Sequence, residues 1–361
     1  MDLLLVSGVG GAGVSGVARG LAHGFRDAGL STAEVNSAMS APVGMSALWS
    51  DTAATFGVWL QGLGASTMSA DELVGLAGLN ELITGGLVAE AVANPNIDVV
   101  IWDMGSTREA LRTLQLLDTV PMLLDRLLTG PTAAQLSAPE PAALITAWYR
   151  LVRHVAAARD EIHSATCVLV GQPSDAAELV AAAGVLRLYD CVTSAFIYNK
   201  VVRKKVKASK SKSKVQSKSK AQRKSTVQGT DVKEAMALAQ EFGIPAVQLS
   251  YRDAGAPKVS KIATRLAPLC GLLKDLPRNA APLWSVGRIK NGYALTFPLR
   301  CGADVRVGRR GDSLLLVCDD HRRQLELPAV LKRCRISGGG MQGESLILRF
   351  TPDPKVWRDE Q

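Results

Sequence analysis

Four glycines near the N-terminus have the spacing of a loop that binds phosphate groups. They follow a short apolar run, residues 3–6, that predicts a buried strand, and they precede an amphipathic segment that predicts a helix from Val14. Glycines let several backbone N–H groups converge on one anion, and the N-terminus of the following helix adds partial positive charge. The residues expected to contact the phosphates are Gly8, Gly10, Gly11, Gly13 and Ser15.

The same loop lacks the cation that such loops normally carry. A working phosphate loop places a lysine directly before its serine or threonine, where the ammonium group reaches the terminal phosphates. Here Val14 occupies that position, next to Ser15. The sequence therefore keeps the backbone that surrounds an anion and lacks the side chain that neutralises it.

A carboxylate, Asp103, follows a β-branched apolar run at residues 97–102. Nucleotide-binding sheets hold their Mg²⁺ ligand at such a position, where a strand ends and opens onto a loop and a helix. Because the glycine loop comes first and Asp103 second, as that fold requires, the pair predicts a nucleotide site with Ser15 and Asp103 as Mg²⁺ ligands. A solvated aspartate at a strand end is the simpler alternative.

Strands and helices are expected to alternate through about residue 275, which is typical of an α/β sheet with crossover helices. Ser174 is expected to cap one of these helices, and Asp231 with Glu234 to cap the helix that stops at Gly243. Strands are expected at residues 3–6, 30–35, 97–102, 165–170, 192–198 and 247–250, and further helices at 70–77, 79–94, 108–117, 121–128, 141–157 and 259–273.

The helical period disappears after residue 277. Short apolar runs alternate with turns, and residues 309–312 and 338–340 are two of the expected turns. This pattern predicts a separate all-β unit of about 70 residues. The expected domains are residues 1–275 and 280–355.

The net charge of +9 comes from one segment. Residues 200–225 contain 12 Lys and Arg and no Asp or Glu, so that the rest of the chain carries −3. Without an aromatic residue this Lys/Ser segment can neutralise phosphates but cannot stack bases, which disfavours specific nucleic-acid binding. Its composition predicts a disordered insert at about residues 200–228. Contact with an anionic membrane surface, nucleic acid or an acidic protein is the alternative.

Composition also excludes several classes of protein. No apolar stretch approaches the roughly 20 residues that span a membrane, and the N-terminus lacks the apolar core of a signal peptide. The six cysteines are scattered without a CxxC pair, which favours neither a disulfide framework nor a zinc site. These features predict a cytoplasmic protein with no transmembrane segment.

Four segments, in order, resemble the arsenical-pump ATPase family, which also contains the cytosolic ATPases that deliver tail-anchored membrane proteins. Residues 8–15 resemble its deviant phosphate loop, GKGGVGKT, and residues 103–112 resemble its second-switch signature, DxAPTGxxLR. Residues 197–202 are similar to its VVNRVLP segment. Residues 284–350 resemble the small heat-shock-protein-like β-sandwich of one bacterial and plastid branch.

The resemblance spans essentially the whole chain and implies a fold and a ligand. The fold is a P-loop NTPase-type, mostly parallel sheet with flanking helices, followed by a small C-terminal all-β sandwich. The ligand is ATP or ADP with Mg²⁺, and the family's adenine-recognising asparagine corresponds to Asn199.

The chain departs from the family where the family performs hydrolysis. Val9 and Val14 stand at the two lysine positions, and residues 36–42 contain no counterpart of the aspartate that orients the attacking water. Each electrostatic contact of this kind is worth about 10²–10³ in rate, so a pseudo-ATPase is expected, with Asp103 as the one catalytic candidate.

The resemblance also implies partners, because the family encloses nucleotide between two subunits. We expect a homodimer, or a heterodimer with a lysine-bearing paralogue, that handles a hydrophobic client protein or regulates the active paralogue. A scaffold that no longer binds nucleotide, or an active ATP hydrolase with an unusual loop, are the alternatives.

Overall fold

The computed structural model describes residues 2–37, 78–129, 153, 155–162, 165–202, 229–252, 258–276, 284–299, 305–318 and 321–354. Most of the basic segment, the expected helix at 70–77 and most of the expected helix at 141–157 lie outside these residues.

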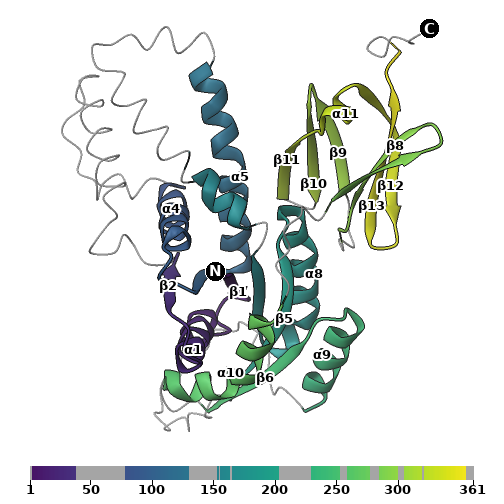
Figure 1. Cartoon of the computed structure of the whole chain (residues 1–361). Helices are drawn as coiled ribbons and strands as arrows, with labels where there is room; N and C mark the ends of the chain where they lie inside the picture. Colours follow the sequence, from purple (N-terminus) through teal and green to yellow (C-terminus); the bar gives the residue numbers. More distant parts are fainter. Residues whose placement is uncertain are drawn as a thin grey trace, which may run out of the picture.

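A six-stranded parallel sheet forms the centre of the N-terminal part (Figure 1). Its order is β2-β3-β1-β4-β5-β6, so that the first strand of the chain lies inside the sheet. Leu4 of β1 pairs with Ile101 of β3 on one side and with Thr166 of β4 on the other. The strands are β1 (Asp2–Gly8), β2 (Thr32–Asn36), β3 (Val99–Ser106), β4 (Thr166–Gly171), β5 (Val192–Val202) and β6 (Ala246–Arg252).

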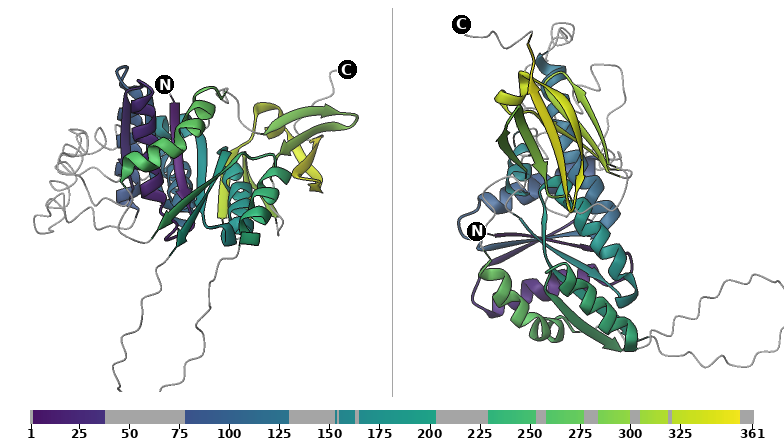
Figure 2. Two further views of the ribbon diagram at one scale, coloured as in Figure 1. Left: turned by 90° about the horizontal axis from the view of Figure 1, so that it is seen from below. Right: turned by 90° about the vertical axis from the view of Figure 1, so that its right-hand side faces the viewer.

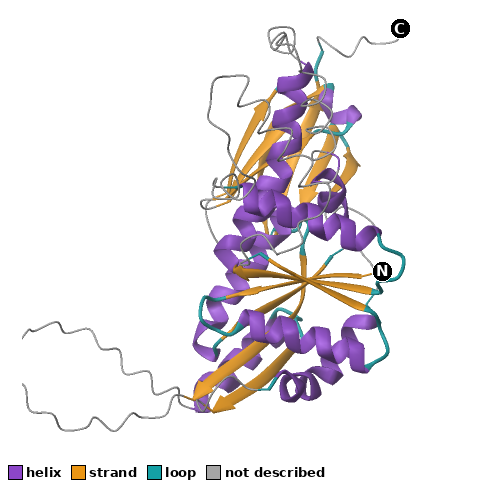
Figure 3. Ribbon diagram, turned by 90° about the vertical axis from the view of Figure 1, so that its left-hand side faces the viewer, coloured by secondary structure: helices purple, strands orange, loops and turns teal. Residues whose placement is uncertain are grey.

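Helices cover both faces of this sheet (Figure 3). Successive side chains of β1 point to opposite faces: Leu3 and Leu5 join one apolar cluster, and Leu4 and Val6 join the other. The second cluster packs α1 (Val14–Asp27) and α10 (Val259–Lys274) against the sheet. The first cluster contains residues of α4 (Leu79–Ala93), α5 (Thr107–Thr129), α8 (Ala176–Leu186) and α9 (Gly229–Glu241).

The C-terminal part consists of two antiparallel sheets, with orders β12-β13-β8-β7 and β11-β10-β9 (Figure 2). Buried side chains such as Leu295, Leu316 and Phe350 fill the space between them. The elements are β7 (Ser285–Ile289), β8 (Gly292–Phe297), β9 (Val305–Arg310), β10 (Ser313–Cys318), β11 (His321–Glu326), α11 (Ala329–Lys332), β12 (Cys334–Gln342) and β13 (Ser345–Pro352). The expected fold class, a P-loop NTPase-type sheet followed by an all-β sandwich, is confirmed.

Two expected breaks in the chain are wrong. Residues 338–340, expected as a turn, lie within strand β12, because glycine adopts extended backbone as readily as a turn and pairing with β13 fixes that choice. The expected break before Pro121 is absent, and α5 is one helix. A proline removes one backbone hydrogen bond, but the packing of the preceding turns, including buried Leu114 and Leu117, holds the helix direction.

Two expected helix caps are also wrong. The turn before α8 is capped by Gln172 together with Asp175, whose carboxylate accepts the Gln172 N–H at 2.7 Å, while the Ser174 hydroxyl only donates to Asp175. Helix α9 begins at Gly229, so Asp231 lies inside it.

The cysteines behave as small apolar residues. The five that the structure describes are buried and form no disulfide, and burial raises the pKa of the Cys167 thiol to about 12. Within the described part of the chain, no group of His, Cys, Asp and Glu could hold a metal ion, and no helix is long and apolar enough to cross a bilayer.

Candidate functional site

The glycine loop joins β1 to α1 at the carboxyl edge of the sheet. Gly11 and Gly13 have φ angles of 79° and 88°, a region that favours glycine. A Cβ atom on Gly8 would lie 1.8 Å from the carbonyl oxygen of Val170. The Val9 N–H donates to that same oxygen at 2.8 Å and fixes the loop to β4. The backbone path therefore requires three of the four glycines.

The fourth glycine, Gly10, is not required by the fold. Its φ is not positive, and a Cβ atom there would meet no heavy atom within 4 Å. The exposed backbone of Gly10 and Gly11 leaves room for an anion to reach the peptide N–H groups. Since the fold does not require a glycine at this position, access of a ligand to the backbone is the better explanation for Gly10.

The start of α1 adds donors to this opening. No side chain of the described residues caps the helix, and its first turn contains no acidic residue. The first N–H groups of a helix have no partner within the helix, and they carry the positive end of its dipole. Ser15, partly buried in this turn, brings a hydroxyl group to the same place. This arrangement can bind phosphate oxygens.

Asn199 of β5 supports the loop from behind. Its side chain is 2% exposed, and its Nδ2 donates to the carbonyl oxygen of Ala12 at 2.6 Å. A Cβ atom on Gly13 would lie 2.8 Å from the same Nδ2. The Oδ1 atom of Asn199 is buried and has no hydrogen-bond partner among the described residues. The structure thus brings together the loop and the asparagine expected at the base, and leaves one acceptor for a ligand.

Asp103 lies on β3 between the strands that end at the loop and at Asn36. It is 4% exposed, so it is not the solvated aspartate of the alternative interpretation. Its Oδ1 accepts the Gly105 N–H at 3.1 Å, and its Oδ2 accepts from Nδ2 of Asn36 at 3.1 Å. The strand continues to Ser106, beyond the end expected at Asp103. Asn36 was missed as a partner, because nothing in the sequence shows that β2 lies next to β3.

The junction of β3 and α5 forms a second side of the opening. Ser106 pairs in register with Gly8. The Glu109 carboxylate accepts hydrogen bonds from the Ser106 N–H at 2.7 Å and from the Ser106 hydroxyl at 2.8 Å. This is a capping box, and the Ser-x-x-Glu pattern at residues 106–109 could have identified it. The next residue, Thr107, has a buried hydroxyl with no partner among the described residues.

The two valines at the lysine positions pack into the apolar core. Val14 is 7% exposed and belongs to the apolar cluster between α1 and the sheet. Val9 is partly buried against both clusters. The described loop therefore offers backbone donors and a hydroxyl, with apolar side chains at both lysine positions.

A parallel sheet with a glycine loop between its first strand and first helix defines a P-loop NTPase-type domain. The chain belongs to the anion-transporting ATPase family, whose model matches residues 25–249. A second model, described as an HSP20-like domain found in ArsA, matches residues 290–350. The suspected family and its branch with an HSP20-like domain are thereby confirmed.

Two curated proteins are similar to the chain. Protein Rv2184c of Mycobacterium tuberculosis is 24% identical over 325 residues, which cover 81% of this chain and 72% of that protein. Uncharacterized protein SCO2128 of Streptomyces coelicolor is 41% identical over 49 residues, which cover 14% of this chain and 13% of that protein.

Two solved structures match the chain at low similarity. A nucleotide-binding protein in complex with ADP from Archaeoglobus fulgidus has a TM-score of 0.34 at 14% identity, covering 73% of this chain and 86% of that one. The cell division protein ftsY of Thermotoga maritima has a TM-score of 0.32 at 17% identity, covering 74% and 68%.

Proposed function

We propose that this chain binds ADP or ATP but hydrolyses it poorly, and that it acts as a nucleotide-dependent subunit rather than as an independent ATPase. The observation that carries the proposal is the combination at the loop. Gly10 leaves an open approach to the backbone donors, while Val9 and Val14 place apolar groups where the family has lysines.

The residues of the site fit a nucleotide phosphate group. Backbone N–H groups of the segment from Gly10 to Ser15 would hold the phosphate oxygens, except that of Ala12, which donates to the Val9 carbonyl oxygen at 3.1 Å. The unpartnered Oδ1 of Asn199 is a buried acceptor of the kind that an adenine amino group satisfies. Mg²⁺ would neutralise phosphate charge when bound, with Ser15 and, through water, Asp103 as the ligands.

Hydrolysis is impaired because phosphoryl transfer depends on positioning and charge neutralisation. In active relatives two lysines supply that charge, and here their positions are apolar. Residue 36, where the segment with the water-orienting aspartate begins, is an asparagine whose amide donates to Asp103. Losing such contacts lowers the rate by about 10²–10³ for each.

The lack of lysines at residues 9 and 14 also favours assembly with a partner subunit. A heterodimer with a lysine-bearing paralogue would receive one cation from that partner, whereas a homodimer would have two deficient sites. In either assembly the HSP20-like domain would contact a hydrophobic client protein or the paralogue. We place this activity in the cytoplasm, where ATP and paralogues of the family are found.

Isothermal titration calorimetry with ADP and ATP, with and without Mg²⁺, tests the proposal. We expect measurable binding and, in a separate phosphate-release assay, negligible turnover. Turnover of about 0.1–10 s⁻¹ would contradict the pseudo-ATPase, because that range is typical of working enzymes of modest rate. No heat with either nucleotide would favour the scaffold that binds no nucleotide.

A further inference from the structure

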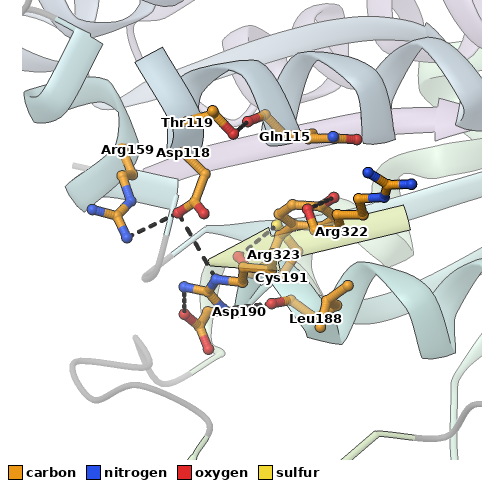
Figure 4. Close-up of polar contacts among 10 residues, drawn as sticks. Gln115, Asp118, Thr119, Arg159, Leu188, Asp190, Cys191, Arg322 and Arg323 are labelled. Carbon is orange, nitrogen blue, oxygen red and sulfur yellow. Dashed lines mark hydrogen bonds and ion pairs between the residues drawn. The ribbon is translucent and has the colours of Figure 1, made fainter. Parts of the chain in front are cut away.

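A buried cluster of charged side chains joins the sandwich to the sheet domain (Figure 4). Arg323 of β11 is 2% exposed, and its guanidinium donates to Asp190 at 2.6 Å and to the carbonyl oxygen of Leu188. Its Nε lies 3.8 Å from Asp118 of α5, and Asp118 pairs with Arg159 at 2.8 Å. We call these four charged residues, Arg323, Asp190, Asp118 and Arg159, the joint.

The joint has a specific orientation because several contacts act together. A buried guanidinium needs its carboxylate and carbonyl partners in place, because an unpaired charge in the protein interior is strongly destabilising. Close to the joint, the hydroxyl of Tyr189 donates to the backbone oxygen of Arg322 at 3.1 Å. The sandwich is therefore held by a directional polar contact, in addition to apolar packing.

The joint is incompletely satisfied in this arrangement. Six buried side-chain atoms of the described residues have no hydrogen-bond partner, and three of them belong to the joint: Asp118 Oδ2, Arg159 Nε and Arg323 Nε. The 3.8 Å between Arg323 Nε and Asp118 Oδ1 is about 0.9 Å longer than a hydrogen bond. A small shift of Asp118 would exchange its hydrogen bond to Arg159 for one to Arg323.

Two more of the six atoms are Asn199 Oδ1, whose residue bonds Ala12 of the glycine loop, and Thr107 Oγ1, whose neighbour Ser106 pairs with Gly8. Thr107 begins α5, and Asp118 follows eleven residues later on the same helix, about 16 Å along its axis. The capping box of Ser106 and Glu109 fixes the first turn of α5 to the end of β3. A single helix thus connects the candidate site with the joint.

We infer that α5 couples nucleotide in the loop to docking of the HSP20-like sandwich, with Asp118 as the residue that changes partner. In this proposal a phosphate group that hydrogen-bonds Thr107 shifts the end of β3 and the first turn of α5 together, and Asp118 moves with the helix toward Arg323. Asp118 Oδ1 lies 2.8 Å from Arg159 and 3.8 Å from Arg323, and we take these two partners as the two states of the coupling element. The inference rests on the proposed nucleotide binding.

The test compares the affinity for ADP and Mg²⁺ of the full chain with that of Arg323→Lys and Asp118→Asn. Coupling is reciprocal, so a variant that weakens the joint must also weaken ADP binding, by at least about fivefold for a coupling of ordinary strength. Arg322→Lys is the matched control, because Arg322 is the exposed neighbour on the same strand. Two joint variants are used so that misfolding of one, seen by circular dichroism, leaves the other.

Hydrogen exchange of the parent chain supplies the second readout. We expect saturating ADP to slow amide exchange in β11 and around Leu188, which lie far from the loop, as well as in the loop itself. Equal ADP affinity in parent, joint variants and control, or protection confined to the loop, would overturn the coupling and leave the proposed function intact. Absence of ADP binding to the parent would overturn both.

Discussion

The side-chain amide of Asn199 donates a 2.6 Å hydrogen bond to the carbonyl oxygen of Ala12, a residue 187 positions earlier in the chain. This contact connects the glycine loop to β5, which lies two strands away from β1 in the sheet. Replacing Asn199 with alanine leaves a buried carbonyl without its donor, which costs about 1–3 kcal/mol. We expect Asn199→Ala to lower the free energy of unfolding by that amount in urea denaturation, and to weaken ADP binding.

Asn199→Asp removes the amide donor of this residue and keeps an acceptor oxygen. A carboxylate of the same size cannot donate to the Ala12 oxygen and repels it, so the loss of stability should be at least as large as in the alanine variant. An unchanged unfolding midpoint in both variants would show that the contact does not hold the loop.

The glycines of the loop provide a matched pair of substitutions. Gly10→Ala places its Cβ in open space without positive φ, so we expect unchanged or slightly higher stability, by up to about 1 kcal/mol, and weaker ADP binding. Gly13→Ala meets both a φ of 88° and the Asn199 amide at 2.8 Å, so it should destabilise the fold itself. Thermal unfolding and calorimetry on both variants distinguish the roles. Tight ADP binding by Gly10→Ala would argue that phosphate does not approach at Gly10.

Restoring lysines at residues 9 and 14 tests the proposed phosphate site. The double variant Val9→Lys with Val14→Lys should bind ATP at least about 10–100-fold more tightly, because even one charge-assisted hydrogen bond contributes about 1.5–3 kcal/mol. Without nucleotide it should be less stable by about 1–3 kcal/mol, since Val14 is buried and lies at the positive end of α1.

The control for the lysine variant is Val9→Met with Val14→Met, which adds length without charge. If the methionine variant gains as much ATP affinity as the lysine variant, the effect is not electrostatic. If neither gains affinity, the loop does not bind phosphate in the proposed way.

Asp118 gives the stability a specific pH dependence. Burial raises the pKa of its carboxyl group, and this effect exceeds the opposing influence of Arg323 and Arg159. The folded protein therefore takes up this proton before the unfolded chain does, so Asp118 favours the folded state increasingly as the pH falls through its raised pKa toward the unfolded value. The stability of Asp118→Asn relative to the parent should decline over the same window.

Asp98 is the control for this pH dependence. Hydrogen bonds from the Ser31 backbone and side chain lower the pKa of this exposed carboxyl group. Its stabilisation is present above the unfolded pKa and is lost as the pH falls through the folded value, so Asp98→Asn should show the opposite trend to Asp118→Asn. Urea unfolding at several pH values between 3 and 7 checks both, and parallel curves for the two variants would contradict the assignment.

Local sequence patterns were sufficient for the strands and helices that position the site. The apolar run before Gly8, the face of α1 that contains Val17 and Leu21, and the run before Asp103 each follow the period of their element. The order of the strands could not be deduced, because it depends on which apolar faces pack together over the whole chain. That order decides the partners of Asp103 and Asn199.

The joint was not foreseen at all. Arg323 lies in a run of polar residues on β11, where alternation alone predicts one exposed side and one buried side. Its burial depends on Asp190 and Asp118, which come from two other parts of the chain. A charged residue that faces inward is recognisable only when the opposing carboxylates are placed by the fold.

The central position of β1 also determines the order in which the sheet can form during synthesis. This strand is synthesised before the other strands of the sheet, yet Leu4 must wait for Ile101 and then for Thr166 before both its edges are paired. At 5–20 residues per second, the second wait lasts about 8–32 s from the moment Leu4 is made. A nascent or truncated chain that ends before β4 therefore carries an apolar strand with an open edge, which is the feature that promotes aggregation and that molecular chaperones shield.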